Sequence, residues 1–206
     1  MLPGVDDGSD SMDTSLLMAS MAAESGVETV IVTPHCNIPG EAANYPSREL
    51  LGRFMALRET IDAAKIPLRI LAGAEVFCTA DIAELIRAKK LLTLASSRYI
   101  LVEFAFNEDS IEMNSCLEQI FAEGLTPVIA HPERYNAVQR DRTLPERWFA
   151  SGYVLQVNKT AFSADSASAP SALRSLFSVR GWRTSRRATR TAPIPAIRSL
   201  PACTSI

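Results

Sequence analysis

The sequence has little histidine, no paired cysteine motif and no long apolar run, and each absence narrows what the chain can do. Its four cysteines include no Cys-x-x-Cys pair, and scattered cysteines of this kind favour reduced thiols in a cytoplasmic protein. No apolar stretch approaches the roughly 18 residues of a membrane helix, and no basic and then apolar leader opens the chain, so we expect neither membrane insertion nor secretion. The formal net charge of −2 does not favour binding to nucleic acid.

Charge is spread unevenly along the 206 residues, which are enough for one substantial domain. Residues 1–160 contain 14 Lys and Arg against 22 Asp and Glu, whereas residues 161–206 contain seven Arg, no Lys and one Asp. From residue 163 onward the composition is of low complexity and shows no amphipathic period. We therefore predict a folded domain over residues 1–162 and an irregular tail over residues 163–206. The tail is a disordered basic segment, the product of a shifted reading frame, which we favour, or an arginine-rich arm that binds phosphates.

Helix-like and strand-like segments alternate within the predicted domain. The helices are expected over residues 13–25, 47–64, 79–89 (with Thr79 as the cap), 110–123 and from Pro145 to just before Gly152. Each helix precedes an apolar run rich in β-branched residues, over residues 28–35, 69–75, 99–103, 125–131 and 153–158. This alternation predicts an α/β fold of parallel strands covered by helices.

Most of the apolar runs end in a side chain that can bind a metal. The chain has only two histidines, and the run-ending residues are His35, Glu75, Glu103 and His131, with Asn158 closing the fifth run. Because the carboxyl ends of parallel strands meet at one edge of a sheet, we expect these side chains to converge. Imidazole and carboxylate together form a ligand set for a divalent cation.

The two glutamates sit in apolar surroundings, where an unpaired carboxylate is expensive to bury. A shared cation would remove that cost for both, and pairing with Arg98 or Arg134 is the alternative. Arg134 follows His131 by three residues, so its guanidinium could clamp a phosphate or form a salt bridge with Glu133 or Glu103.

The loop over residues 2–8, LPGVDDG, leads into the first predicted helix. Asp and Gly in such a loop commonly make turns and cap helices. In the company of the two histidines and two glutamates, Asp7 becomes a further candidate metal ligand.

Six short motifs occur in an order that resembles a known family. They are LPGVDDG, TPH, GAEV, VEF, AHPERY and LQVN, spread over about residues 2–160. Together they resemble the bacterial capsular-polysaccharide tyrosine phosphatases, a branch of the PHP (polymerase and histidinol phosphatase) superfamily. The resemblance implies a distorted (β/α) barrel of seven parallel strands that holds a trinuclear metal centre, with manganese as the metal. It also implies that a metal-activated water hydrolyses phosphotyrosine on the tyrosine kinase that controls exopolysaccharide export.

By position, the resemblance implies roles for individual residues. Arg134 would be the substrate-binding and catalytic arginine, Asp7 would share in catalysis, and the metal ligands would be Asp7, His35, Glu75, Glu103 and His131. A metal-dependent mechanism needs no cysteine nucleophile, and the sequence has no Cys-x5-Arg phosphatase loop.

The chain also departs from the family pattern. The family opens with a His-x-His pair and carries an Asp-x-His pair and another arginine in its last third, and a chain with two histidines in other motifs contains neither pair. We therefore expect an incomplete barrel with little or no turnover. Three alternatives remain: a PHP phosphoesterase acting on a small molecule such as histidinol phosphate, a non-catalytic remnant that docks the kinase, and a metal-free α/β domain whose strand-end residues only cap turns.

Overall fold

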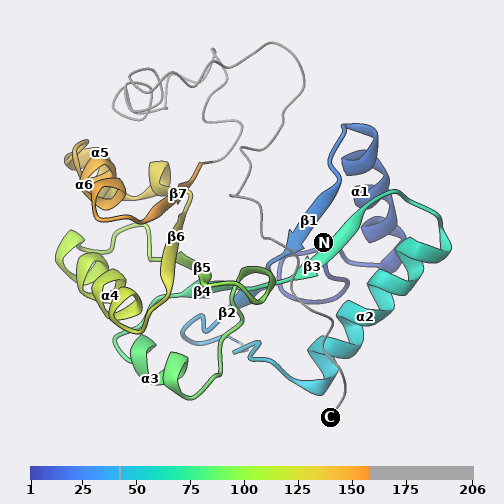
Figure 1. The fold of residues 1–206 in the computed structure, drawn as a ribbon, viewed down its shortest axis with the longest axis horizontal. Helices are drawn as coiled ribbons and strands as arrows, with labels where there is room; N and C mark the ends of the chain where they lie inside the picture. Colours follow the sequence, from blue (N-terminus) through green and yellow to red (C-terminus); the bar gives the residue numbers. More distant parts are fainter. Residues whose placement is uncertain (42, 158–206) are drawn as a thin grey trace.

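Parallel strands with helices packed beside them make up the structure, a computed structural model that describes residues 1–41 and 43–157 (Figure 1). The strands are β1 (Thr29–Val32), β2 (His35–Cys36), β3 (Arg69–Ala72), β4 (Glu75–Phe77), β5 (Tyr99–Glu103), β6 (Thr126–Ala130) and β7 (Val154–Gln156). The α-helices are α1 (Met12–Glu24), α2 (Arg48–Ala63), α3 (Ile82–Arg87), α4 (Ser110–Ala122), α5 (Asn136–Arg140) and α6 (Leu144–Ala150). Two 3₁₀ turns, η1 (Leu94–Ser96) and η2 (Pro132–Arg134), precede β5 and follow β6. Among the described helices, none is both long and apolar enough to cross a membrane.

The strands follow one another across the sheet in chain order. One group pairs as β2-β4-β5-β6-β7, and β1 pairs with β3, every pair being parallel. β1 and β2 come from one predicted run that breaks before Pro34, and β3 and β4 come from another that breaks at Gly73. Backbone hydrogen bonds from Gly73 N–H to the Val32 carbonyl (3.0 Å) and from Glu75 N–H to the Pro34 carbonyl (3.0 Å) continue the ladder across both breaks.

The predicted α/β class with parallel strands is confirmed, but the barrel is not. Within residues 1–41 and 43–157 the sheet is open, with β1 and β2 along one edge and β7 at the other. The predicted tail over residues 163–206 and the predicted strand end at Asn158 lie outside the described residues.

The predicted helices form, with small corrections at their ends. Ser11, Ser47 and Asp109 accept hydrogen bonds from the first turns of α1, α2 and α4, as N-caps do. The prediction that Thr79 caps α3 is wrong: Asp81 is the N-cap residue, and the Thr79 hydroxyl hydrogen-bonds to its carboxylate at 2.6 Å. The short helix α5 was not predicted, because five residues are too few to show an amphipathic period.

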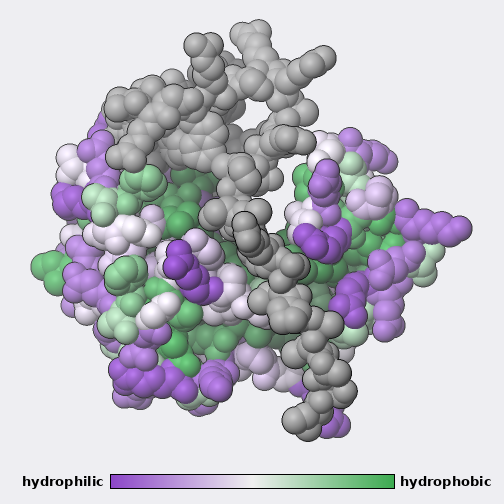
Figure 2. Space-filling view, in the orientation of Figure 1, coloured by the Kyte–Doolittle hydropathy of each residue, from purple (hydrophilic) through white to green (hydrophobic). Residues whose placement is uncertain are grey.

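The two faces of the main sheet carry apolar clusters of different size. One face packs against α3, α4, α5 and α6 through fully buried residues such as Val76, Val102 and Ile129. The other face carries a smaller apolar cluster around Leu101 and Val128, together with η1. A third cluster joins the N-terminal loop, α1 and α2 to β1 and β3. On the face shown in Figure 2, hydrophilic residues concentrate along the outer rim, over the helices.

Gly73 offers a test of the break between β3 and β4. A Cβ atom there would lie 2.9 Å from Ile31 Cγ2 and 3.1 Å from Leu94 Cδ2, so we expect Gly73→Ala to lower the free energy of unfolding by about 1–3 kcal/mol through overpacking. Gly52 is the matched control because its position in α2 is open, and Gly52→Ala should raise stability by about 0.5–1 kcal/mol. Urea unfolding of both variants makes the comparison, and a neutral or stabilising Gly73→Ala would contradict this packing.

Candidate metal centre

Strand geometry places three predicted ligands on one face of the sheet. His35 lies opposite Glu75 in the register of β2 and β4, and Phe77 lies opposite Glu103 in that of β4 and β5. Successive side chains of a strand point to opposite faces, so His35, Glu75 and Glu103 share the face of Leu101, while the intervening residues pack under the helices.

His131 reaches the same face through an unusual backbone conformation. Continued alternation after Ala130 would turn its ring toward the helices. Instead, His131 adopts the left-handed region, with φ 33° and ψ 52°, and Pro132 begins η2 directly after it. Left-handed non-glycine residues are uncommon and cluster at functional sites. The result is that His131 Nε2 lies 3.0 Å from Glu75 Oε1.

The two histidines and two glutamates form one connected cluster. His35 Nδ1 lies 2.7 Å from Glu103 Oε1, and His131 Nε2 lies 3.6 Å from Glu103 Oε2 as well as close to Glu75. Glu103 is buried and the other three are half-buried. The alternative in which Glu75 and Glu103 pair with arginine does not hold in this geometry, because imidazoles occupy their carboxylates.

These contacts shift the protonation of the cluster. The hydrogen bond with Glu103 raises the pKa of His35 from 6.5 to about 9. Burial alone would lower the pKa of His131, but Glu103 and Glu75 together raise it from 6.5 to about 9. Burial alone would raise the pKa of Glu103, but the two imidazoles lower it from 4.5 to about 2. Without a metal, the cluster is therefore held together by two protonated histidines at neutral pH.

The N-terminal loop brings two aspartates to the edge of this cluster. The predicted ligand Asp7 has a side chain that is 85% exposed, with Oδ1 3.7 Å from His35 Nε2. Its neighbour Asp6, which sequence reasoning did not single out, accepts hydrogen bonds from the backbone N–H of His35 (2.6 Å) and of Gly8 (2.9 Å). Asp6 thus ties the loop to β2. The only signal in the sequence was the doubled aspartate, which does not reveal which carboxylate turns toward the backbone.

Arg134 lies beside the cluster, within a group of aromatic residues. Its guanidinium is 4.4 Å from the centroid of the Phe106 ring, and that ring in turn meets the His131 ring edge-on with centroids 6.0 Å apart. The contact found for the Arg134 guanidinium is thus an aromatic face, whereas Arg53, Arg87 and Arg147 form ion pairs with carboxylates.

The cluster fits a divalent cation. One nitrogen or oxygen from each of His35, Glu75 and Glu103 lies within 4.8 Å of the others. Ligands bonded to one ion at about 2.1 Å lie up to about 4.2 Å apart, so a small inward movement of these side chains would let all three bind one ion. Mixed imidazole and carboxylate donors suit several first-row divalent metals, so the donor set does not select one of them. The buried Nδ1 of His131 has no hydrogen-bond partner among the described residues, which marks this ring as one that its own surroundings do not satisfy.

A separate cavity among the described residues lies apart from this cluster. It measures about 440 Å³ and is lined mainly by apolar side chains from the N-terminal loop, β1 and α2, including Leu2, Val32 and Phe54. Ser47 and Arg48 are the polar members of its lining, and none of the clustered histidines and glutamates takes part in it.

Metal-free stability should follow pH in a defined way. Raised histidine pKa values stabilise the folded chain fully below pH 6.5, and this contribution disappears as pH rises through about 9. The lowered pKa of Glu103 contributes fully above pH 4.5, and this contribution disappears toward pH 2. In EDTA, the stability difference between wild type and Glu103→Gln should be largest between pH 4.5 and 6.5. Urea unfolding across pH measures it, and a difference that grows toward pH 9 would contradict the assignment.

Asp6 should support metal binding through His35. Asp6→Asn removes one of two carboxylate acceptors, so the His35 backbone is held less firmly, and we expect about tenfold weaker Mn²⁺ binding by calorimetry. Asp10→Asn is the control, because Asp10 lies just after this loop, before α1, but accepts a hydrogen bond from the Thr14 hydroxyl. Equal Mn²⁺ affinities in the two variants would show that Asp6 does not support metal binding.

Comparison with known proteins places this cluster in a family context. The family profile described as capsular polysaccharide synthesis, CpsB/CapC, matches residues 1–176. The tyrosine-protein phosphatase CpsB of Streptococcus pneumoniae is 31% identical over 154 residues, covering 75% of this chain and 63% of the relative. The tyrosine-protein phosphatase YwqE of Bacillus subtilis is 30% identical over 164 residues, covering 76% of this chain and 61% of the relative.

A solved structure agrees with these sequence matches. Crystal structures of YwqE from Bacillus subtilis and CpsB from Streptococcus pneumoniae are described as unique metal-dependent tyrosine phosphatases. The match has a TM-score of 0.71 at 28% identity and covers 78% of this chain and 64% of the other. The chain therefore spans less than two thirds of the length of these relatives. With its profile match, its relatives and its fold in agreement, the chain belongs to the CpsB/CapC family of capsular polysaccharide synthesis proteins.

Proposed function

We propose that this chain is a metal-dependent protein-tyrosine phosphatase of the PHP superfamily that acts in capsule and exopolysaccharide synthesis. The observation that carries the proposal is the meeting of His35, Glu75, Glu103 and His131 at the ends of neighbouring parallel strands. Relatives with this fold are named tyrosine phosphatases, which favours phosphotyrosine over a small molecule such as histidinol phosphate as substrate.

Different residues of the chain have different roles at this site. His35, Glu75, Glu103 and His131 would hold the metal, with Asp7 as a ligand from the exposed side. When bound, a divalent cation lowers the pKa of a coordinated water and neutralises charge on the phosphoryl oxygens. The Arg134 guanidinium binds the phosphoryl group through paired N–H donors. The exposed Asp7 carboxylate can accept a proton from the attacking water, or return a proton to the leaving phenolate.

The physiological setting follows from the same proposal. The metal is Mn²⁺, the substrate is a phosphotyrosine protein, and the partner is a bacterial tyrosine kinase of polysaccharide export. The reaction takes place in the cytoplasm, where thiols stay reduced, in keeping with the three free, buried cysteines of the described residues.

The direct test is hydrolysis of a phosphotyrosine peptide with and without Mn²⁺. We expect hydrolysis that requires the metal and falls to the metal-free background in Glu103→Gln and His131→Ala. We also expect turnover below that of full-length Streptococcus pneumoniae CpsB assayed alongside. Asp10→Asn serves as the matched carboxylate control and should behave as wild type.

Two results would overturn the proposal. Hydrolysis that survives EDTA or His131→Ala would place the activity outside this cluster. Histidinol phosphate turned over faster than the peptide would reassign the substrate to a small molecule.

A further inference from the structure

Phe106 is an exposed aromatic residue at the edge of the candidate metal centre. It lies in the loop after β5 and remains 46% exposed although its ring meets the His131 ring at 6.0 Å between centroids. The Tyr135 ring is tilted beside the Phe106 ring, with centroids 6.5 Å apart. Because Phe106 is about half exposed, its burial contributes little to the stability of the fold. Its contacts with the candidate metal centre are therefore the better guide to its role.

The face of Phe106 holds the guanidinium of Arg134. The guanidinium carbon lies 4.4 Å from the ring centroid, a distance typical of a cation–π contact. The backbones of the two loops are joined as well, because Asn136 N–H donates to the Phe106 carbonyl at 2.8 Å. Within its own turn, Arg134 N–H donates to the His131 carbonyl at 2.9 Å. Ring and guanidinium are thus held together next to a metal-ligating strand end.

Two other arginines of the described chain, Arg87 and Arg147, are held by carboxylates instead. Arg87 pairs with Glu123 at 2.6 Å and Arg147 pairs with Asp141 at 2.7 Å, so carboxylates occupy their N–H donors. An aromatic face attracts a guanidinium without accepting its in-plane hydrogen bonds. The Phe106 ring therefore fixes the direction of Arg134 without itself occupying the N–H donors that would bind an anion.

We propose that Phe106 is a positioning residue that aims Arg134 at the phosphoryl group of the substrate. The inference rests on the proposed function, because it takes Arg134 as the phosphate-binding arginine. Phe106 acts by limiting the conformations of the arginine before the anion arrives, so that less conformational freedom is lost on binding.

The test measures binding of inorganic phosphate to the chain loaded with Mn²⁺, by calorimetry. Phe106→Leu keeps an apolar side chain but removes the aromatic face, and we expect about two- to fivefold weaker phosphate binding. Phe106→Tyr restores the face and should restore affinity. Arg134→Ala should weaken binding about tenfold or more, and the double variant with Phe106→Leu should be no weaker than Arg134→Ala alone.

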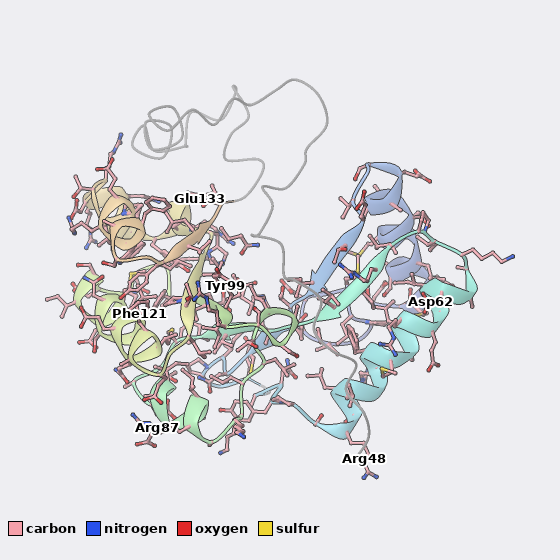
Figure 3. The ribbon with its side chains drawn as sticks, viewed as in Figure 1. Arg48, Asp62, Arg87, Tyr99, Phe121 and Glu133 are labelled. Atoms are coloured by element: carbon pink, nitrogen blue, oxygen red, sulfur yellow. The ribbon has the colours of Figure 1, made fainter. Side chains whose placement is uncertain are left out.

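A matched control and a second measurement separate positioning from folding. Phe121 on α4 is 50% exposed and packs on Tyr153 at 5.7 Å, away from the strand ends (Figure 3), so Phe121→Leu should bind phosphate as wild type does. In the metal-free chain, NMR relaxation of the Arg134 Nε–H group should show greater mobility in Phe106→Leu. Mn²⁺ affinity and melting temperature should not change.

The outcomes distinguish this inference from the function on which it rests. Wild-type affinity in Phe106→Leu, beside weak binding in Arg134→Ala, would overturn the inference alone. Additive losses in the double variant would also overturn it, because the ring would then act without the arginine. Wild-type affinity in Arg134→Ala would overturn the phosphate-binding role of Arg134, and the inference with it. A wild type that binds neither Mn²⁺ nor phosphate would count against the proposed function, while the mobility of Arg134 would still decide the role of Phe106.

Discussion

Two glutamate carboxylates brought together at the end of a parallel sheet require positive charge, and this requirement organises the rest of the site. Glu103 is buried and Glu75 half-buried, so neither carboxylate is well solvated. Two protonated histidines supply the charge in the metal-free chain. A divalent cation with two neutral imidazoles carries the same total charge, so the cluster can exchange two protons for one metal ion without a change in its net charge.

The fold meets this requirement with a few local devices. Because neighbouring strands are parallel, His35, Glu75 and Glu103 lie together at the carboxyl-terminal side of the sheet. The breaks at Pro34 and Gly73 divide two strands without interrupting their hydrogen-bonded ladder, and the helices bury the opposite face. Left-handed backbone at His131 then adds the fourth side chain, at a conformational cost that the surrounding structure must offset.

Much of this arrangement could be predicted from the sequence, because it follows from short-range rules. Apolar runs that end in His35, Glu75, Glu103 and His131 predicted parallel strands and the convergence of their final residues. What the sequence did not reveal depends on three-dimensional contacts. The turn of Asp6 toward the His35 backbone and the stacking of Arg134 on Phe106 each join segments that are far apart or separated by a helix. Closure of a barrel likewise depends on pairing between distant strands, and in the described residues the sheet stays open.

Under the proposed function, a divalent cation takes the place of the two imidazolium protons. Calorimetric titration with Mn²⁺ at pH 7, repeated in buffers of different ionisation enthalpy, counts the protons released on binding. Because the pKa of each histidine is raised to about 9 in the metal-free chain, we expect release of close to two protons per cation. Binding with no proton release, or the same release in Glu103→Gln, would contradict it.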